Sequence, residues 1–242
     1  MLEVKNIKKT FGGVKAVDGS SFAVQENMIT ALIGPNGAGK TTIFDIISGL
    51  LPADSGEIYL AGKSISNLRP DQIANLGVSR TFQQVRLFRN LSILDHLLMA
   101  QDNLDLAVTR NLFNNKKIQK KDYQEYIKEF GLKKTLTTKV SDLSYGQRKL
   151  LSMAIAFLKM HKILLLDEPV AGVNKVIQKE IEDTLMRFKS EKKTILVIEH
   201  DMEFVKKLAD WIIVLDQGRV LAEGKPDDVL NNPRVLEAYL GE

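Results

Sequence analysis

The glycine-rich segment GPNGAGKTT at residues 34–42 constrains this chain most, because an apolar run precedes it and a helix-like run follows it. Gly34, Gly39, Lys40 and Thr41 have the spacing G-x-x-x-x-G-K-[ST] of a phosphate-binding loop. The glycines allow successive backbone N–H groups to turn toward a phosphate, and a helix that begins near Gly39 adds its positive end. Lys40 can reach β- and γ-phosphates, and the Thr41 hydroxyl can ligate Mg²⁺. The residues predicted to contact the nucleotide are Gly34, Pro35, Asn36, Gly37, Ala38, Gly39, Lys40, Thr41 and Thr42.

Short apolar runs rich in β-branched residues recur along the chain, and several are unbroken rather than alternating. Unbroken runs of this length are typical of strands that are covered on both faces. Helix-period stretches at 175–190 and 201–209 lie between the later runs, which predicts an α/β fold with a largely parallel sheet. The runs are FAV at 22–24, MITALI at 28–33, EIYL at 57–60, ILLL at 163–166, TILVI at 194–198 and WIIVL at 211–215.

The middle of the chain has a helical pattern with few strand signals. Ser92 is suited to cap the start of one helix, and Gly131 is suited to end another. We therefore expect residues 86–158 to form a helical lobe, inserted between the core segments 1–85 and 159–242. Residues 110–121 carry five basic side chains and no acidic one. A solvated face or loop explains this stretch better than a contact with lipid headgroups or a partner.

Composition narrows the function classes. The net charge of +4, from 34 basic and 30 acidic residues, is too small to indicate a nucleic-acid binder. The chain has no cysteine, which excludes disulfides, thiolate metal sites and a cysteine nucleophile. No signal peptide is recognisable at the N-terminus, and no apolar run approaches the length of a membrane span. We expect a cytosolic protein whose membrane role, if it has one, comes through a partner.

Two adjacent carboxylates, Asp167 and Glu168, follow the buried run ILLL. If strand geometry persists, their side chains point to opposite faces and can take different tasks. Asp167 would hold Mg²⁺ together with Thr41, and Glu168 would act as the general base for an attacking water. Such a pair is weak evidence alone and strong evidence beside a phosphate-binding loop.

Two further side chains follow predicted strands, where an open α/β sheet places its ligand. His200 follows the run TILVI and could bind the γ-phosphate and the catalytic water. Gln83 ends a short predicted strand in SRTFQQVRLF. It could touch Mg²⁺ or the water when the adjacent loop moves in, but its residue type alone does not decide this. His96 and His161 are read as surface residues or as histidines with satisfied hydrogen bonds.

Five elements stand in one order along the chain: GPNGAGKTT, TFQQ, LSYGQ, ILLLDEP and EHD. This order resembles the nucleotide-binding subunit of ATP-binding cassette (ABC) transporters over essentially the whole chain. The resemblance implies a P-loop ATPase with a RecA-like parallel-sheet core, an N-terminal antiparallel β subdomain and an inserted α-helical lobe. LSYGQ is similar to that family's signature motif LSGGQ, with Tyr145 in place of the first inner glycine. Ser144, Gly146 and Gln147 would then meet the γ-phosphate held by Lys40 of the partner subunit.

The resemblance implies further roles. Phe11 matches the aromatic residue that stacks on adenine, and Val17 matches the apolar contact near it; the alternative for Phe11 is a core position. Asn174 stands where the family usually has Asp. Asn keeps the capacity for hydrogen bonding but lacks the negative charge. Lys175 stands where the most similar branch commonly has Pro.

That branch comprises the ATP-binding subunits of branched-chain amino-acid importers. The stretches that resemble it most are SRTFQQVRLF, EPVAGVN and the C-terminal part from LADWIIVLDQG to YLG. Such a subunit would bind ATP and Mg²⁺, pair with an identical or different ATPase subunit, and lie on the inner face of the membrane beneath transmembrane permease subunits. The groove from Gln83 to Phe88 would pass the motion of the ATPase subunit to the permease subunits. A periplasmic or extracellular binding protein would deliver the substrate.

Three alternatives remain open. The ending YLGE also resembles ATPases of lipopolysaccharide or lipid export. A soluble ABC protein of DNA repair or translation usually has two cassettes or a long coiled-coil insertion, which this chain lacks. A regulatory module without turnover is disfavoured by Glu168 and His200. Among substrates of an importer, urea, amides and other amino acids are not excluded.

Overall fold

The computed structural model describes residues 1–82, 85–101, 120–158 and 161–240. The chain forms two compact units. The first comprises residues 1–80, 161–168 and 185–242, and the second comprises residues 81–160 and 169–184. The expected lobe, residues 86–158, lies within the second unit, which also takes in residues 169–184.

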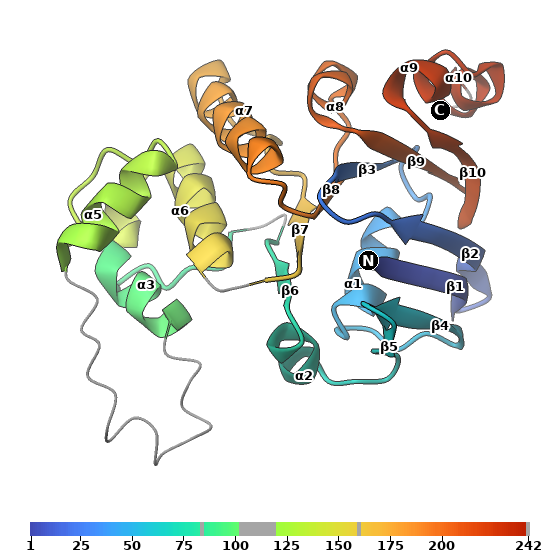
Figure 1. Cartoon of the computed structure of the whole chain (residues 1–242), viewed down its shortest axis with the longest axis horizontal. Coiled ribbons are helices and arrows are strands. Elements are labelled where there is room, and N and C mark those ends of the chain that lie inside the picture. Colours follow the sequence, from blue (N-terminus) through green and yellow to red (C-terminus); the bar gives the residue numbers. More distant parts are fainter. Residues whose placement is uncertain (83–84, 102–119, 159–160, 241–242) are drawn as a thin grey trace. The chain divides into compact units, whose positions relative to one another are not determined.

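The first unit contains an antiparallel sheet in the order β2-β1-β4-β5 (Figure 1). Its strands are β1 (Leu2–Phe11), β2 (Val14–Val24), β4 (Ser55–Leu60) and β5 (Lys63–Ser64). In β1 the apolar residues Leu2, Val4 and Ile7 are buried, while Lys5 and Lys8 are exposed. One face of this sheet therefore packs on the core, as alternating strands require. The expected N-terminal antiparallel subdomain is confirmed.

A second sheet of the first unit has the order β10-β9-β3-β8-β7-β6 (Figure 1). The strands β3 (Ile29–Ile33), β6 (Val78–Arg80), β7 (Ile163–Asp167), β8 (Ile195–Ile198) and β9 (Trp211–Asp216) run parallel, and β10 (Arg219–Gly224) is antiparallel to β9. Every residue of β3, β7 and β8 is buried. The pairing of these strands confirms the parallel sheet that was predicted from the unbroken apolar runs. The runs are unbroken because strands covered on both faces have no polar face.

Helices of the first unit connect its strands or follow them. They are α1 (Lys40–Ile47), α2 (Pro70–Asn75), α8 (Met202–Leu208), α9 (Pro226–Leu230) and α10 (Pro233–Leu240). Asp201 caps α8, because its carboxylate accepts a hydrogen bond from Phe204 N at 3.0 Å. The carboxyl ends of β3, β7 and β8 meet at one sheet edge, which is where open parallel sheets bind ligands.

The second unit is helical, as predicted. It contains α3 (Ile93–Gln101), α5 (Lys120–Glu129), the 3₁₀ turn Val140–Asp142 and α6 (Tyr145–Leu158), and α7 (Lys175–Ser190) begins in it. Buried apolar side chains, including Leu97, Ile127 and Leu151, form its own core.

Both predicted helix ends in the second unit are confirmed. Ser92 Oγ accepts a hydrogen bond from Asp95 N at 3.2 Å and so caps α3. Gly131 ends α5 with a φ of 74°. A residue without a Cβ adopts this left-handed conformation most easily.

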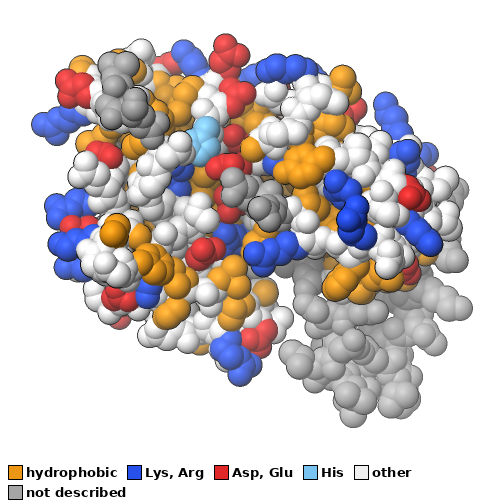
Figure 2. Space-filling model, turned by 180° about the vertical axis from the view of Figure 1, so that it is seen from behind, with side chains coloured by type: hydrophobic (Ala, Val, Ile, Leu, Met, Phe, Trp, Pro, Cys, Tyr) orange, Lys and Arg blue, Asp and Glu red, His pale blue; other side chains and the backbone are white. Residues whose placement is uncertain are grey.

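Surface charge is mixed, in keeping with the small net charge. Figure 2 shows acidic and basic side chains interspersed on the face seen there. Residues 110–119 of the basic stretch lie outside the described residues.

Candidate functional site

The glycine-rich loop between β3 and α1 packs directly on neighbouring backbone. A Cβ on Gly34 would lie 2.0 Å from the Leu215 carbonyl oxygen, and a Cβ on Gly39 would lie 2.3 Å from the Ala16 carbonyl oxygen. No side chain fits at these distances, so the close packing itself requires glycine. Within the predicted loop Gly34, Pro35, Ala38 and Lys40 are buried, Gly39 and Thr42 are half-buried, and Asn36, Gly37 and Thr41 are exposed.

Lys40 reaches back across this loop. Its side chain is buried, with 6% of the residue exposed, and its Nζ donates to the carbonyl oxygens of Gly34 at 2.6 Å and Pro35 at 2.8 Å. The ammonium group therefore lies inside the turn, next to the first turn of α1. An anion placed there would meet both Lys40 and the helix N-terminus.

The turn between β9 and β10 supports the loop, a contribution that the sequence motifs did not indicate. Gly218 N donates to the Ala38 carbonyl oxygen at 3.1 Å. Gly218 O in turn accepts from Asp18 N at 2.8 Å and from Ser20 Oγ at 2.6 Å. These bonds tie the loop to strand β2.

Phe11 and Val17 lie in different surroundings. Phe11 is 47% exposed at the end of β1, and Lys9 Nζ lies 5.6 Å from its ring centroid. The core alternative for Phe11 is therefore wrong. Val17 is buried, with its Cγ2 3.5 Å from the position of a Cβ on Gly39. Val17 thus packs against the phosphate-binding loop.

Asp167, the last residue of β7, is 3% exposed. Its Oδ2 accepts a hydrogen bond from Arg80 Nη2 at 3.1 Å. Burial raises the pKa of this carboxyl group above its usual value, and the hydrogen bond and charge of Arg80 oppose that rise. Arg80 was not singled out from the sequence.

Glu168 leaves the strand geometry, and the predicted alternation of faces does not extend to it. Its φ is +47°, in the left-handed region, which costs a non-glycine residue about 1 to 2 kcal/mol. Its N–H still donates to the Ile198 carbonyl oxygen at 3.0 Å. The backbone of Glu168 therefore stays on the sheet while its side chain is redirected.

The redirected carboxylate meets His200. Glu168 Oε1 lies 3.0 Å from His200 Nε2, and both side chains are partly exposed. The structure thus brings together two residues that are 32 positions apart in sequence. Backbone strain at a site of this kind is a common mark of function. Gln83 lies outside the described residues.

His96 is satisfied by local bonds, as predicted. It is buried, its Nδ1–H donates to the Ser92 carbonyl oxygen at 2.9 Å, and its Nε2 accepts from Phe88 N at 3.0 Å. His161 is half-buried.

In the second unit, LSYGQ forms a capped helix start. Ser144 Oγ accepts from Gln147 N at 3.2 Å, and Gln147 Oε1 accepts from Ser144 N at 3.0 Å. This reciprocal pair is a capping box for α6. The Ser144 hydroxyl hydrogen can still be donated outward, because the cap uses only the oxygen. Gly146 packs on α7, where an added Cβ would lie 2.8 Å from Ile177 Cγ1.

Tyr145 packs beside the segment that follows Glu168. A Cβ on Gly172 would lie 3.4 Å from Tyr145 Cε1, and Tyr145 remains 40% exposed. Lys149 Nζ lies 5.7 Å from the Tyr145 ring centroid and donates to the Ala171 carbonyl oxygen at 2.8 Å. Tyr145 and Lys149 therefore hold residues 171–172 against the first turns of α6.

Asn174 keeps the capping role that an aspartate would have. Its Oδ1 accepts from Ile177 N at 3.0 Å, immediately before α7 begins at Lys175. Both Asn and Asp are good helix N-caps, so the loss of charge does not remove this bond.

Two parts of the chain match known protein families. Residues 17–171 match the family described as ABC transporter, and residues 219–242 match the one described as branched-chain amino acid ATP-binding cassette transporter. The chain belongs to the ABC transporter family. It is an ATPase of that family's α/β P-loop type.

Two relatives match over nearly their whole length. The chain is 37% identical over 250 residues to the high-affinity branched-chain amino acid transport ATP-binding protein BraF of Pseudomonas aeruginosa, covering 100% of this chain and 98% of that protein. It is 37% identical over 248 residues to the probable branched-chain amino acid transport ATP-binding protein LivG of Archaeoglobus fulgidus, covering 100% and 95%.

Solved structures of ABC cassettes have the same fold. A nucleotide-free ATP-binding cassette from an ABC transporter has a TM-score of 0.85 and 33% identity, covering 100% of this chain and 99% of that chain. Another ABC transporter cassette, in its ADP conformation, has a TM-score of 0.84 and 32% identity with the same coverage.

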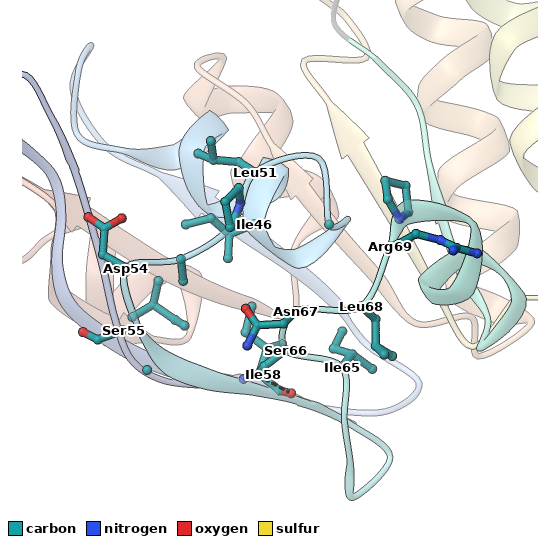
Figure 3. Close-up of a pocket in the computed structure, with 16 residues that line it drawn as sticks. Ile46, Leu51, Asp54, Ser55, Ile58, Ile65, Ser66, Asn67, Leu68 and Arg69 are labelled. Atoms are coloured by element: carbon teal, nitrogen blue, oxygen red, sulfur yellow. Dashed lines mark hydrogen bonds between the residues drawn. The ribbon is translucent and has the colours of Figure 1, made fainter.

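The pocket in Figure 3 is separate from the residues that are predicted to contact the nucleotide. It has a volume of about 370 Å³ and lies at the end of α1 opposite to Lys40. Ile46 and Leu51 line one side, and the start of β4 and residues 65–70 line the others. None of the predicted nucleotide contacts is among its lining residues.

The described residues contain neither a membrane-spanning helix nor a cluster of metal ligands. Among them, no helix combines the length and apolar character needed to cross a membrane. Within the same ranges, no cluster of three or more His, Cys, Asp or Glu side chains is arranged to hold a metal ion. Mg²⁺ in nucleotide sites commonly needs only one or two protein oxygens beside phosphates and water.

Proposed function

We propose that this chain is the ATP-hydrolysing subunit of a membrane transporter that imports branched-chain amino acids. The observation that carries the enzymatic part is the Glu168–His200 pair, which lies in the same compact unit as the phosphate-binding loop. The full-length similarity to BraF and LivG, together with the match of residues 219–242, supports the transported substrate.

The phosphates bind through the backbone of residues 34–42 and through Lys40. Lys40 Nζ exchanges its bonds to the Gly34 and Pro35 carbonyl oxygens for bonds to the β- and γ-phosphates. The exposed ring of Phe11 stacks on adenine, which needs only an aromatic face and gives little base selectivity.

Thr41 and Asp167 are the proposed Mg²⁺ ligands. A hydroxyl and a carboxylate are oxygen donors of the kind that Mg²⁺ prefers, so the residues present fit this ion. When bound, Mg²⁺ supplies positive charge that neutralises the β- and γ-phosphate oxygens. Gln83 is proposed as a further contact to the metal or to the water.

Glu168 is the proposed general base. Its carboxylate takes the proton of the attacking water, while His200 Nε2 holds the carboxylate by the 3.0 Å hydrogen bond to Oε1. His200 also contacts the γ-phosphate and the water in this proposal. The left-handed backbone of Glu168 is part of the same arrangement, because it turns the side chain out of the strand.

The working unit is a pair of ATPase subunits, identical or different. The start of α6 presents a Ser144 hydroxyl and the backbone N–H groups of its first turn to an anion. This anion is the γ-phosphate held by Lys40 of the partner subunit. Gly146 and Gln147 complete the same helix start.

Ser144→Ala tests this pairing. Loss of the cap should lower the free energy of unfolding by about 1 kcal/mol, and loss of the hydroxyl should abolish the ATP-dependent dimer while one subunit still binds ATP. Ser92→Ala is the matched control, because it removes the equivalent capping bond of α3 in the same unit. Sedimentation with ATP and Mg²⁺ should show dimer for the control and monomer for Ser144→Ala. Equal dimer for both would contradict the role of Ser144.

Apolar side chains on the second unit support a membrane partner. Phe88 is 64% exposed, and Leu98 and Met99 of α3 are also exposed. His96 fixes the Phe88 segment by accepting the Phe88 N–H. We place a short helix of a transmembrane permease subunit on the surface that carries Phe88, which puts the ATPase on the inner face of the membrane. Substrate delivery by a periplasmic or extracellular binding protein is part of the same proposal.

Phe88→Asp tests this surface. A buried, unpaired carboxylate at the interface should release most of the ATPase from membranes that contain the permease. Leu50→Asp, at an exposed apolar residue of the first unit, should leave the membrane-bound fraction unchanged. Immunoblots of washed membranes measure this fraction, and thermal unfolding checks that both variants are folded. Equal membrane-bound fractions of the two variants would show that Phe88 is not part of the interface.

Uptake in cells tests the proposed substrate. Deletion of this gene should reduce the uptake of radiolabelled leucine, isoleucine and valine, and the wild-type gene should restore it. Unchanged uptake of all three, with reduced uptake of urea or an amide, would move the substrate to another class.

A further inference from the structure

Arg80 ends strand β6 with its side chain 7% exposed. Its Nη1 donates to Asp45 Oδ1 at 2.7 Å and to Ser48 Oγ at 2.7 Å. Its Nη2 donates to Asp167 Oδ2 at 3.1 Å. One guanidinium group therefore joins helix α1 to the ends of β6 and β7, all within the first unit.

The ion pairs of Arg80 with Asp45 and Asp167 are not needed merely to fill this part of the core. Buried ion pairs of this kind can often be replaced by apolar residues without loss of stability, because burying both charges is costly. Arg80 also stacks against Phe44, with its Cζ 5.6 Å from the ring centroid. An aromatic ring and three hydrogen bonds thus restrict the guanidinium on several sides.

The two carboxylates that Arg80 joins have distinct positions. Asp45 lies on α1 four residues after Thr41, which is about one helical turn. Asp167 ends the strand that leads to Glu168. The guanidinium therefore fixes the end of β7 relative to the helix that carries Thr41.

We propose that Arg80 is a positioning residue of the ATPase: by holding Asp167 Oδ2, it orients the carboxylate so that Oδ1 can bind the metal ion that Thr41 also binds. This inference rests on the proposed function. The planar guanidinium can bridge two carboxylates at fixed angles, whereas the ammonium group of lysine cannot. Residues that orient metal ligands in this way commonly change metal affinity by 10- to 100-fold when they are replaced.

The positive charge of Arg80 and its positioning role predict opposite changes in metal affinity when Arg80 is replaced. A cation beside a metal site repels the metal, so removal of the charge alone should tighten metal binding. Removal of an orienting group should weaken it. The sign of the change therefore separates the two effects.

Mn²⁺ binding in the presence of ADP, followed by electron paramagnetic resonance, measures this sign without ATP turnover. Arg80→Gln should weaken Mn²⁺ binding by roughly tenfold, with ADP affinity in EDTA unchanged within about twofold. Arg80→Lys should lie between Arg80→Gln and the wild type. Arg69→Gln is the matched control, because Arg69 pairs with Asp71 on the surface of the same unit, and it should bind Mn²⁺ like the wild type.

Mn²⁺ binding by Arg80→Gln that is equal to or tighter than wild type would overturn the positioning role. If Arg80→Gln does not fold, Arg80→Lys decides, and wild-type Mn²⁺ affinity in that variant overturns the inference. Failure of the wild type to bind Mn²⁺ and ADP would instead overturn the proposed function. If the wild type binds Mn²⁺ and ADP, and Arg80→Gln binds Mn²⁺ equally well, only the role of Arg80 is overturned.

Discussion

Glu168→Gln is expected to lower ATP turnover by at least about 100-fold, because a general base contributes roughly 10² to 10⁴ in rate. ATP binding should stay within about twofold, since the substitution keeps the size of the side chain. Gln Oε1 can still accept a hydrogen bond from His200 Nε2, as Glu168 Oε1 does at 3.0 Å. With hydrolysis blocked and binding intact, the ATP-bound dimer should accumulate.

Phosphate release and size-exclusion chromatography with ATP and Mg²⁺ measure the two effects. Glu191→Gln serves as the control, because Glu191 is an exposed carboxylate after α7 in the same unit. It should turn over ATP like the wild type. Turnover by Glu168→Gln at the wild-type rate would remove Glu168 from the reaction and leave the Glu168–His200 pair without a catalytic role.

Gly39→Ala is expected to disrupt the loop and abolish ATP binding. The added Cβ would lie 2.3 Å from the Ala16 carbonyl oxygen, at a backbone φ of 99°. The clash and the left-handed backbone together should lower the free energy of unfolding by about 2 to 5 kcal/mol. Because the clashing atom belongs to the backbone of β2, relief requires movement of the loop itself.

Gly62→Ala separates the clash from the backbone strain. Gly62 has a φ of 76° and nothing within 4 Å of an added Cβ. This control should lose about 1 to 2 kcal/mol from the left-handed backbone alone and should bind ATP normally. Urea unfolding and titration with a fluorescent ATP analogue give both quantities. Equal stability and equal ATP affinity of the two variants would show that the contact with Ala16 is unimportant.

Much of the fold follows from local sequence pattern. Each of the six apolar runs proved to be part of a strand. The runs in β3, β7 and β8 are continuously apolar because these strands are buried on both faces. Strands β1 and β10 were not predicted. In β1 the residues Lys5, Lys8 and Lys9 interrupt the apolar pattern, and only one face is buried. Pairing with β2 and β4, which sequence periodicity does not reveal, holds this strand in place.

The candidate site is predictable where its residues form motifs and unpredictable where they meet only in space. The phosphate-binding loop, the two carboxylates and His200 each follow a recognisable strand. Arg80 has partners 35 and 87 positions away, at Asp45 and Asp167, so local pattern could not identify it. The left-handed backbone of Glu168 was likewise not predicted, because strand alternation assumes that the extended geometry persists.

The most direct test of the account is ATP-driven uptake in proteoliposomes. The liposomes would contain this ATPase together with the permease subunits that co-purify with it, with ATP inside and binding protein and radiolabelled leucine outside. Leucine should accumulate inside the liposomes only when ATP and Mg²⁺ are enclosed. Excess isoleucine or valine should suppress this accumulation, and Glu168→Gln should abolish it. Leucine accumulation that is the same with Glu168→Gln as with the wild type, or ATP-driven export in its place, would contradict the account.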